Sequence, residues 1–140
     1  MDIREEILKE HSKQNAENIA AWVCRSPQRV QQLMHLFLHE EYRVVQRLAQ
    51  VVGKISDSHP QLLMPHLSAL VQRIKEPGVH VAVKRNVVRI LQNVEMPEAL
   101  HGDIMNICFD LLADVNEPVA VRVFSMTVLH NLSKHYPEIR

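Results

Sequence analysis

The sequence predicts an all-α fold of about seven helices that pair into hairpins. Three segments, beginning at Val44, Val83 and Val121, carry one shared pattern of mostly apolar residues. Within each segment these residues stand at i, i+4, i+5, i+7, i+8 and i+11, which marks a broad face of an α-helix, whereas a strand would alternate. The chain has only three glycines in 140 residues, and so few turn residues favour long helices over a many-stranded sandwich.

Prolines indicate where the helices begin. Pro27, Pro60, Pro97 and Pro137 each follow a helical run, and proline is tolerated in a first helical turn while it stops the helix before it. Pro65 lies inside one of the runs, so we expect a kink or an irregular first turn there. The predicted helices cover residues 2–25, 27–39, 41–57, 60–76, 79–95, 97–113 and 118–135.

Short joints decide how these helices are arranged. Joints of about two to five residues force consecutive helices to lie antiparallel. A hairpin cannot bury its apolar face alone, so the hairpins 27–57, 60–95 and 97–135 are expected to stack within one domain, 1–140. The helix 2–25 is expected to cap this stack, because its outer face is charged at Arg4, Glu5, Lys9, Glu10, Lys13 and Glu17.

Two of the hairpins resemble HEAT repeats. The resemblance spans about 27–135. It rests on the residues at 62–67 and 74–77, on Val83, Lys84, Val87, Ile90 and Leu91, and in the next hairpin on 111–114, Pro118, Val121, Arg122, Val128 and Leu129.

The resemblance implies a right-handed α–α superhelix of HEAT-like hairpins, with the second helices on the concave side. It also implies that Asp114 and Arg122, and less closely Glu76 and Lys84, tie adjacent repeats together. HEAT arrays are mostly scaffolds that bind partner proteins.

Charge is balanced overall but unevenly placed. Sixteen Lys and Arg offset sixteen Asp and Glu, which disfavours a globally basic nucleic-acid binder and an acidic-tail protein. The second helices, 42–56, 79–94 and 119–134, carry eight Lys and Arg and no acid. A neutral protein can therefore still present a cationic face to a partner.

We expect this cationic face to bind a partner. The alternative interpretation is that it is only a solvated polar surface. The residues of this face are spaced three and four positions apart, so they lie on one side of their helices. The expected partner-binding residues are Arg47, Gln50, Lys54, Arg85, Arg89, Asn93, Phe124, Thr127, Asn131 and Lys134.

The favoured function is a non-enzymatic scaffold for an acidic or mixed protein or peptide. One alternative is a nucleic-acid-binding protein related to DNA-alkylation-repair arrays, and a second is a small lyase-like or cofactor-handling protein, on analogy with bilin-lyase arrays. Exposed ends of the stack also make a homodimer a candidate assembly.

No residue pattern indicates catalysis, a cofactor or a metal. His35 and His39 stand at i and i+4, but no third ligand accompanies them, so we expect surface histidines. Cys24 and Cys108 lack a C-x-x-C partner and are expected to be reduced thiols.

With no secretory signal and no apolar run of about 20 residues, the expected location is the cytoplasm, without a membrane partner.

Overall fold

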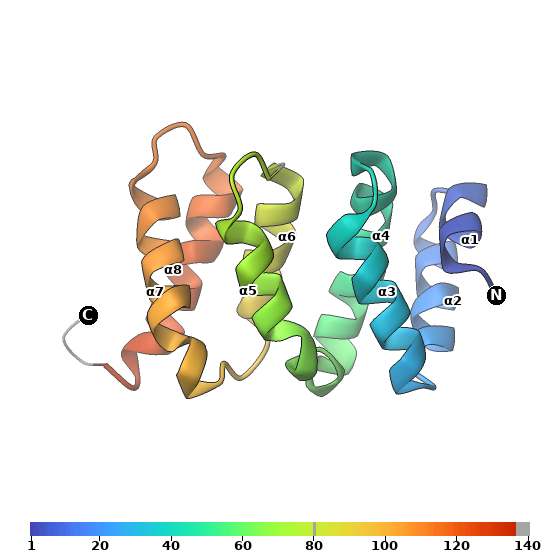
Figure 1. The fold of residues 1–140 in the computed structure, drawn as a ribbon, viewed down its shortest axis with the longest axis horizontal. Coiled ribbons are helices and arrows are strands. Elements are labelled where there is room, and N and C mark those ends of the chain that lie inside the picture. The colour runs from blue at the N-terminus through green and yellow to red at the C-terminus, as the bar shows by residue number, and fades with distance from the viewer. Residues whose placement is uncertain (80, 137–140) are drawn as a thin grey trace. The chain divides into compact units, whose positions relative to one another are not determined.

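The computed structural model describes residues 1–79 and 81–136, with the backbone alone for 81 and 82. Within these residues there are eight α-helices, three short 3₁₀ turns and no strand, which confirms the all-α prediction (Figure 1). The residues divide into two compact units, Met1–Leu67 and Ser68–Arg140, and each is described by itself. The single domain over 1–140 and the right-handed superhelix stay predictions.

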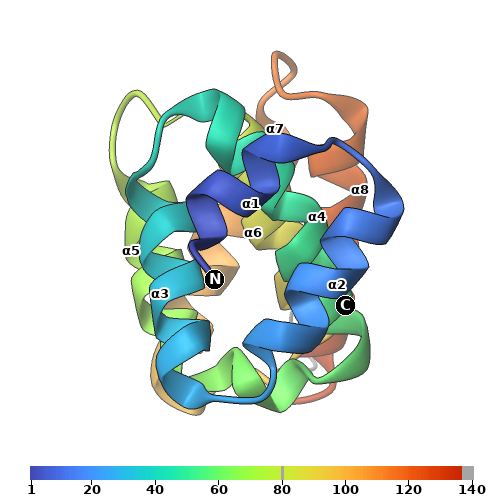
Figure 2. The same cartoon turned by 90° about the vertical axis from the view of Figure 1, so that its right-hand side faces the viewer.

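Unit 1 contains four helices arranged as two hairpins (Figure 2). These helices are α1 (Ile3–Lys9), α2 (Lys13–Val23), α3 (Pro27–His39) and α4 (Tyr42–Ser58). Helix α4 packs against all three of the others. Its face of Val44, Leu48, Val51, Val52 and Ile55 is completely buried, as the apolar pattern predicts.

The prediction of one helix over 2–25 is wrong, because the chain leaves the helical conformation between α1 and α2. Glu10 is extended, and the Ser12 side chain caps α2 by accepting a hydrogen bond from the Asn15 N–H at 3.0 Å. The Asn15 amide donates to the carbonyls of Glu6 and Glu10, at 2.9 and 2.8 Å. Since these bonds satisfy the end of one helix and the start of the next, the N-terminal segment is itself a hairpin.

The only tryptophan of the chain joins the two hairpins of unit 1. The Arg29 guanidinium on α3 lies 3.9 Å from the centre of the Trp22 ring on α2. The same side chain donates a hydrogen bond to the Trp22 carbonyl at 2.9 Å. A cation over an indole face is a favourable contact, so Trp22 and Arg29 help to hold α2 against α3.

Unit 2 contains α5 (Leu67–Lys75), α6 (Val81–Leu91), α7 (His101–Ala113) and α8 (Val119–Ser133). Helix α8 packs on both α6 and α7. The joint after α5 turns at Gly78, whose φ of 77° is a conformation that glycine adopts without strain. On α8 the buried face is formed by Val121, Ser125, Val128, Leu129 and Leu132, as its spacing predicts.

Several helices start later than predicted. The turns η1 (Pro60–Leu62) and η2 (Met64–His66) precede α5, and η3 (Glu98–Leu100) precedes α7. The irregular start expected around Pro65 is therefore confirmed. Proline removes a donor and restricts the residue before it, which favours short 3₁₀ turns over a regular first turn at these places.

A buried histidine fixes the beginning of α7 to the end of the described chain. The Nε2 of His101 lies 2.7 Å from the Met96 carbonyl, and its Nδ1 lies 3.2 Å from the Tyr136 hydroxyl. Because a carbonyl only accepts, the His101 Nε2 carries a proton and donates it to the Met96 carbonyl. None of the described helices combines the length and the apolar character that a membrane span requires.

Candidate functional site

The residues expected to bind a partner fall in both units. Arg47, Gln50 and Lys54 lie on α4 in unit 1, and the other seven lie on or beside α6 and α8 in unit 2. Their surroundings differ between the two units, so we describe each set separately.

In unit 1 the three side chains hold the first hairpin against α4. Arg47 Nη1 donates to the carbonyls of Ile7 and Leu8, at 3.3 and 3.2 Å. These carbonyls belong to the last turn of α1, where the negative end of a helix attracts a cation. Lys54 Nζ lies 3.4 Å from a carboxylate oxygen of Glu17 on α2, and the Gln50 amide nitrogen lies 3.1 Å from the ring of His11. The side chains of Arg47, Gln50 and Lys54, which the sequence predicts to bind a partner, therefore make contacts within unit 1.

We expect Arg47→Ala to destabilise the protein by about 1–2 kcal/mol, because two helix-end carbonyls lose a charged donor. Arg43→Ala is the matched control, since Arg43 is an exposed arginine on the same helix, and we expect a change within about 0.5 kcal/mol. The free energy of unfolding in urea, followed by circular dichroism, compares the two. Equal values for the two variants would show that the Arg47 contacts do not stabilise unit 1.

Among the charged residues on helices that the sequence predicts to bind a partner, the two arginines of α6 in unit 2 are the most accessible. Arg85 and Arg89 are both exposed, and neither forms an ion pair with a described residue. They stand one turn apart, so they lie on one side of the helix. We call Arg85 and Arg89 the arginine pair.

The expected residues on and after α8 are partly engaged within unit 2. The Asn131 amide donates to the Gln92 carbonyl at 3.3 Å, and the Thr127 hydroxyl donates to the Val123 carbonyl of its own helix at 3.3 Å. Phe124 is half-buried, whereas Lys134 is exposed at the end of α8. Asn131 thus ties α8 to the residue that follows α6, much as Arg47 ties α4 to the end of α1.

The ties between hairpins differ from those that the HEAT resemblance implies. Arg122 donates to the Leu112 carbonyl at 3.2 Å, and Asp114 accepts from the N–H of Asn116 at 2.9 Å, so both bond within their own hairpin. Two ion pairs join the hairpins α5–α6 and α7–α8, namely Lys84 with Glu117, at 3.3 Å, and Lys75 with Asp103, at 3.6 Å. The Glu117 side chain is only 10% exposed. Lys84 therefore has the expected linking role, while Asp114 and Arg122 do not have it within these residues.

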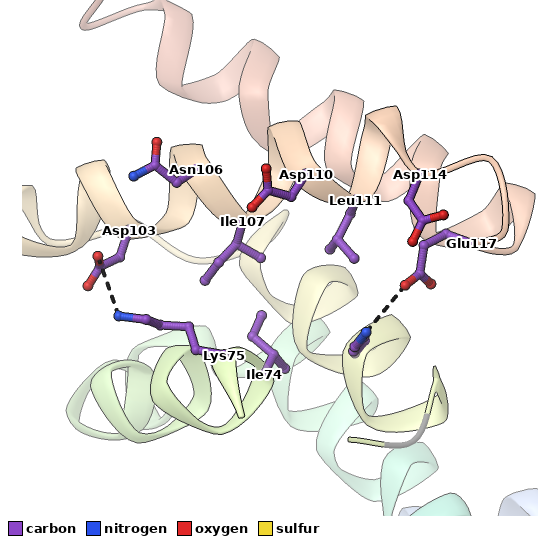
Figure 3. Close-up of a pocket in the computed structure, with 10 residues that line it drawn as sticks. Ile74, Lys75, Asp103, Asn106, Ile107, Asp110, Leu111, Asp114 and Glu117 are labelled. Carbon is purple, nitrogen blue, oxygen red and sulfur yellow. Dashed lines mark hydrogen bonds and ion pairs between the residues drawn. The ribbon is translucent and has the colours of Figure 1, made fainter. Parts of the chain in front are cut away.

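A cleft of about 510 Å³, which the sequence did not predict, opens between α5, α6 and α7 (Figure 3). The ion pair of Lys75 with Asp103, at 3.6 Å, closes one side, and the pair of Lys84 with Glu117 closes the other. Two lysines face four acidic residues across this cleft, which makes it acidic. Its lining residues are Ile74, Lys75, Lys84, Asp103, Asn106, Ile107, Asp110, Leu111, Asp114 and Glu117.

His35 and His39 are exposed neighbours on α3, with ring centres 4.8 Å apart. Throughout 1–79 and 81–136, no three His, Cys, Asp or Glu side chains are grouped so that they could hold a metal ion. The two histidines thus resemble the surface pair that the sequence predicts.

Comparison with protein families matches residues 3–140 to the family described as HEAT repeat domain. The match extends over the hairpin α1–α2, which lies outside the stretch of about 27–135 that carries the resemblance in the sequence. No curated protein and no solved structure matches the chain.

Proposed function

Because the chain belongs to the HEAT repeat domain family, we propose that it is a non-enzymatic interaction module that binds an acidic partner protein through unit 2. HEAT repeat domains are helical repeats that often serve as protein-interaction scaffolds. The arginine pair of α6 carries the more specific part of this proposal.

The arginine pair has the chemistry that an acidic partner needs. Helix α6 contains Lys84, Arg85 and Arg89 and no acidic residue. An exposed guanidinium keeps all its donors available, and their planar arrangement matches the two oxygens of a carboxylate. Two such groups on one helix face favour a segment that carries two or more Asp or Glu side chains.

Residues beside the arginine pair complete the proposed surface. Helices α6 and α8 pack together, and the half-buried Phe124 offers part of an aromatic ring for contact. Asn93, Thr127, Asn131 and Lys134 are the further members in unit 2. Arg47, Gln50 and Lys54 are left out, because their side chains already bind α1, α2 and the joint between them.

The test is a double charge reversal with a matched control. We expect Arg85→Glu with Arg89→Glu to reduce capture of partner proteins from a native lysate at least about 10-fold, since lost interface charges commonly cost more than 1.4 kcal/mol. Arg25→Glu with Arg43→Glu makes the same change in net charge at two exposed arginines of unit 1, and it should capture partners as the wild type does.

Two results would contradict the proposal. Equal capture by both double variants would show that the arginine pair is not the binding surface. Capture that disappears after nuclease treatment, together with DNA or RNA binding that weakens steeply with salt, would favour the nucleic-acid alternative instead.

A further inference from the structure

The cleft between α5, α6 and α7 in unit 2, here called the acidic cleft, combines an apolar centre with a charged edge. Ile74, Ile107 and Leu111 point toward one another between the two ion pairs of the cleft (Figure 3). Ile74 and Leu111 are buried, and Ile107 is half-buried. The volume of about 510 Å³ lies within the range of roughly 300–1,000 Å³ that is typical of ligand pockets. The cleft therefore has room for an apolar stem beside its charges.

Two carboxylates of the acidic cleft have no cationic partner among the described residues. Both lysines of the cleft are already paired with acidic residues at its sides. Asp110 and Asp114 are exposed and form no ion pair with a described residue, and Asp114 accepts one hydrogen bond, from the Asn116 N–H. Since they stand four residues apart, Asp110 and Asp114 are neighbours on one side of α7. After its internal pairs are formed, the cleft keeps two negative charges.

The position of these two carboxylates opposes the electrostatics of their own helix. Asp110 lies in the last turn of α7, and Asp114 follows its last residue. This end of a helix carries a partial negative charge, which attracts cations and disfavours carboxylates. The last turn of α7 has no basic residue, and Arg122, which donates to the Leu112 carbonyl there, pairs with neither aspartate. Residues that oppose local stability in this way are expected at functional sites.

We propose that the acidic cleft binds an arginine side chain of a partner protein. The guanidinium has five donors in one plane, so two of its edges can each bind one carboxylate, that of Asp110 and that of Asp114. The aliphatic stem of the arginine packs on the apolar centre, which a bare metal ion would leave uncovered. The arginine pair of α6 does not line the cleft, so this site does not depend on the proposed binding of an acidic partner.

Fluorescence polarisation with a short peptide tests the charge that the cleft recognises. The probe is Ala-Ala-Arg-Ala-Ala-amide with tetramethylrhodamine on its N-terminus. Its control carries citrulline, which keeps the shape of arginine without the charge. We expect saturable binding of the probe, with a dissociation constant of the order of 10⁻⁴ M. The citrulline peptide should bind at least about 10-fold more weakly, because hydrogen bonds between ionised groups are stronger than neutral ones.

A double variant tests the two carboxylates. Asp110→Asn with Asp114→Asn removes both charges and keeps the size of the side chains, and it should weaken binding of the arginine peptide at least about 10-fold. Glu95→Gln with Glu98→Gln makes the same change in net charge at two exposed residues of unit 2 outside the cleft lining, and it should bind like the wild type. The cleft variant should also unfold at a higher urea concentration, because it relieves the unfavourable charges at the end of α7.

Four results would overturn the proposal. The first is a wild type without saturable binding up to about 1 mM protein, and the second is equal affinity for the arginine and citrulline peptides. The third is an equal loss of affinity in both double variants, which would show unspecific attraction by net charge. The fourth is a cleft variant that unfolds at a lower urea concentration than the wild type, which would give the carboxylates a structural role.

Two further results would identify a different occupant and would also overturn the proposal. Displacement of the peptide by about 5 mM CaCl₂ at constant ionic strength would indicate a site for a metal ion. Self-association of the wild type that disappears in the cleft variant would indicate a second copy of the chain. Circular dichroism checks that each variant is folded, and Asp110→Asn alone provides the same comparison if the double cleft variant does not fold.

Discussion

Cys108 is expected to react with iodoacetamide at pH 8 about 1,000-fold more slowly than an unperturbed cysteine. Its side chain is completely buried on α7, and burial raises the pKa of the thiol to about 12, although a hydrogen bond with Ser125 partly opposes this shift. The thiolate is the nucleophile, so an increase of about three pKa units lowers its population about 1,000-fold.

Cys24 provides an internal comparison for this reaction. It is only half-buried, and burial raises the pKa of its thiol as well. Mass spectrometry of the two cysteine-containing peptides after brief labelling should find Cys24 modified first, and both modified in urea. Equal labelling in the folded protein would show that Cys108 is more accessible than its burial indicates.

The same raised pKa makes stability depend on alkaline pH. The unfolded thiol ionises near its ordinary pKa of about 9, whereas the folded thiol stays protonated up to a pKa of about 12. The contribution of Cys108 is therefore fully present below pH 9. It declines by about 1.4 kcal/mol for each pH unit above that value until the folded thiol also ionises.

Leu48→Ala is expected to destabilise the protein by about 3 kcal/mol. Leu48 lies on the buried face of α4 and has no exposed surface. Truncating a buried leucine loses apolar burial and leaves a cavity that the neighbouring side chains fill only in part. The free energy of unfolding from urea titrations measures this effect directly.

Val115→Ala is the control for that measurement. Val115 is 80% exposed in the joint between α7 and α8, so its truncation should change the free energy of unfolding by less than about 0.5 kcal/mol. A loss below about 1 kcal/mol for Leu48→Ala would contradict the packing described around α4.

The repeating apolar pattern predicted most of the fold because it depends on local geometry. The spacing at Val44, Val83 and Val121 identifies a helix face without knowledge of what packs on it. The break between α1 and α2 was missed because it depends on the Ser12 cap and the two bonds of the Asn15 amide. These are short polar contacts within a segment that otherwise has a helical composition.

The candidate site was harder to predict because a helix face does not specify its neighbour. Arg47 and Arg89 stand on second helices in nearly the same part of the repeat, and the sequence gives them the same role. In the structure Arg47 binds the end of α1, while Arg89 is exposed. The sequence did not predict the acidic cleft, because its walls come from three different helices and the pattern of one helix does not specify which others lie beside it.

The stacking of Arg29 on Trp22 also gives the protein a built-in optical probe. Because the indole is unique and lies in α2, emission excited at about 295 nm reports on the first four helices alone, whereas far-ultraviolet ellipticity averages over both halves. Superimposable melting curves from the two signals would mean that the halves unfold as one cooperative system, and separated curves would mean that each half melts independently.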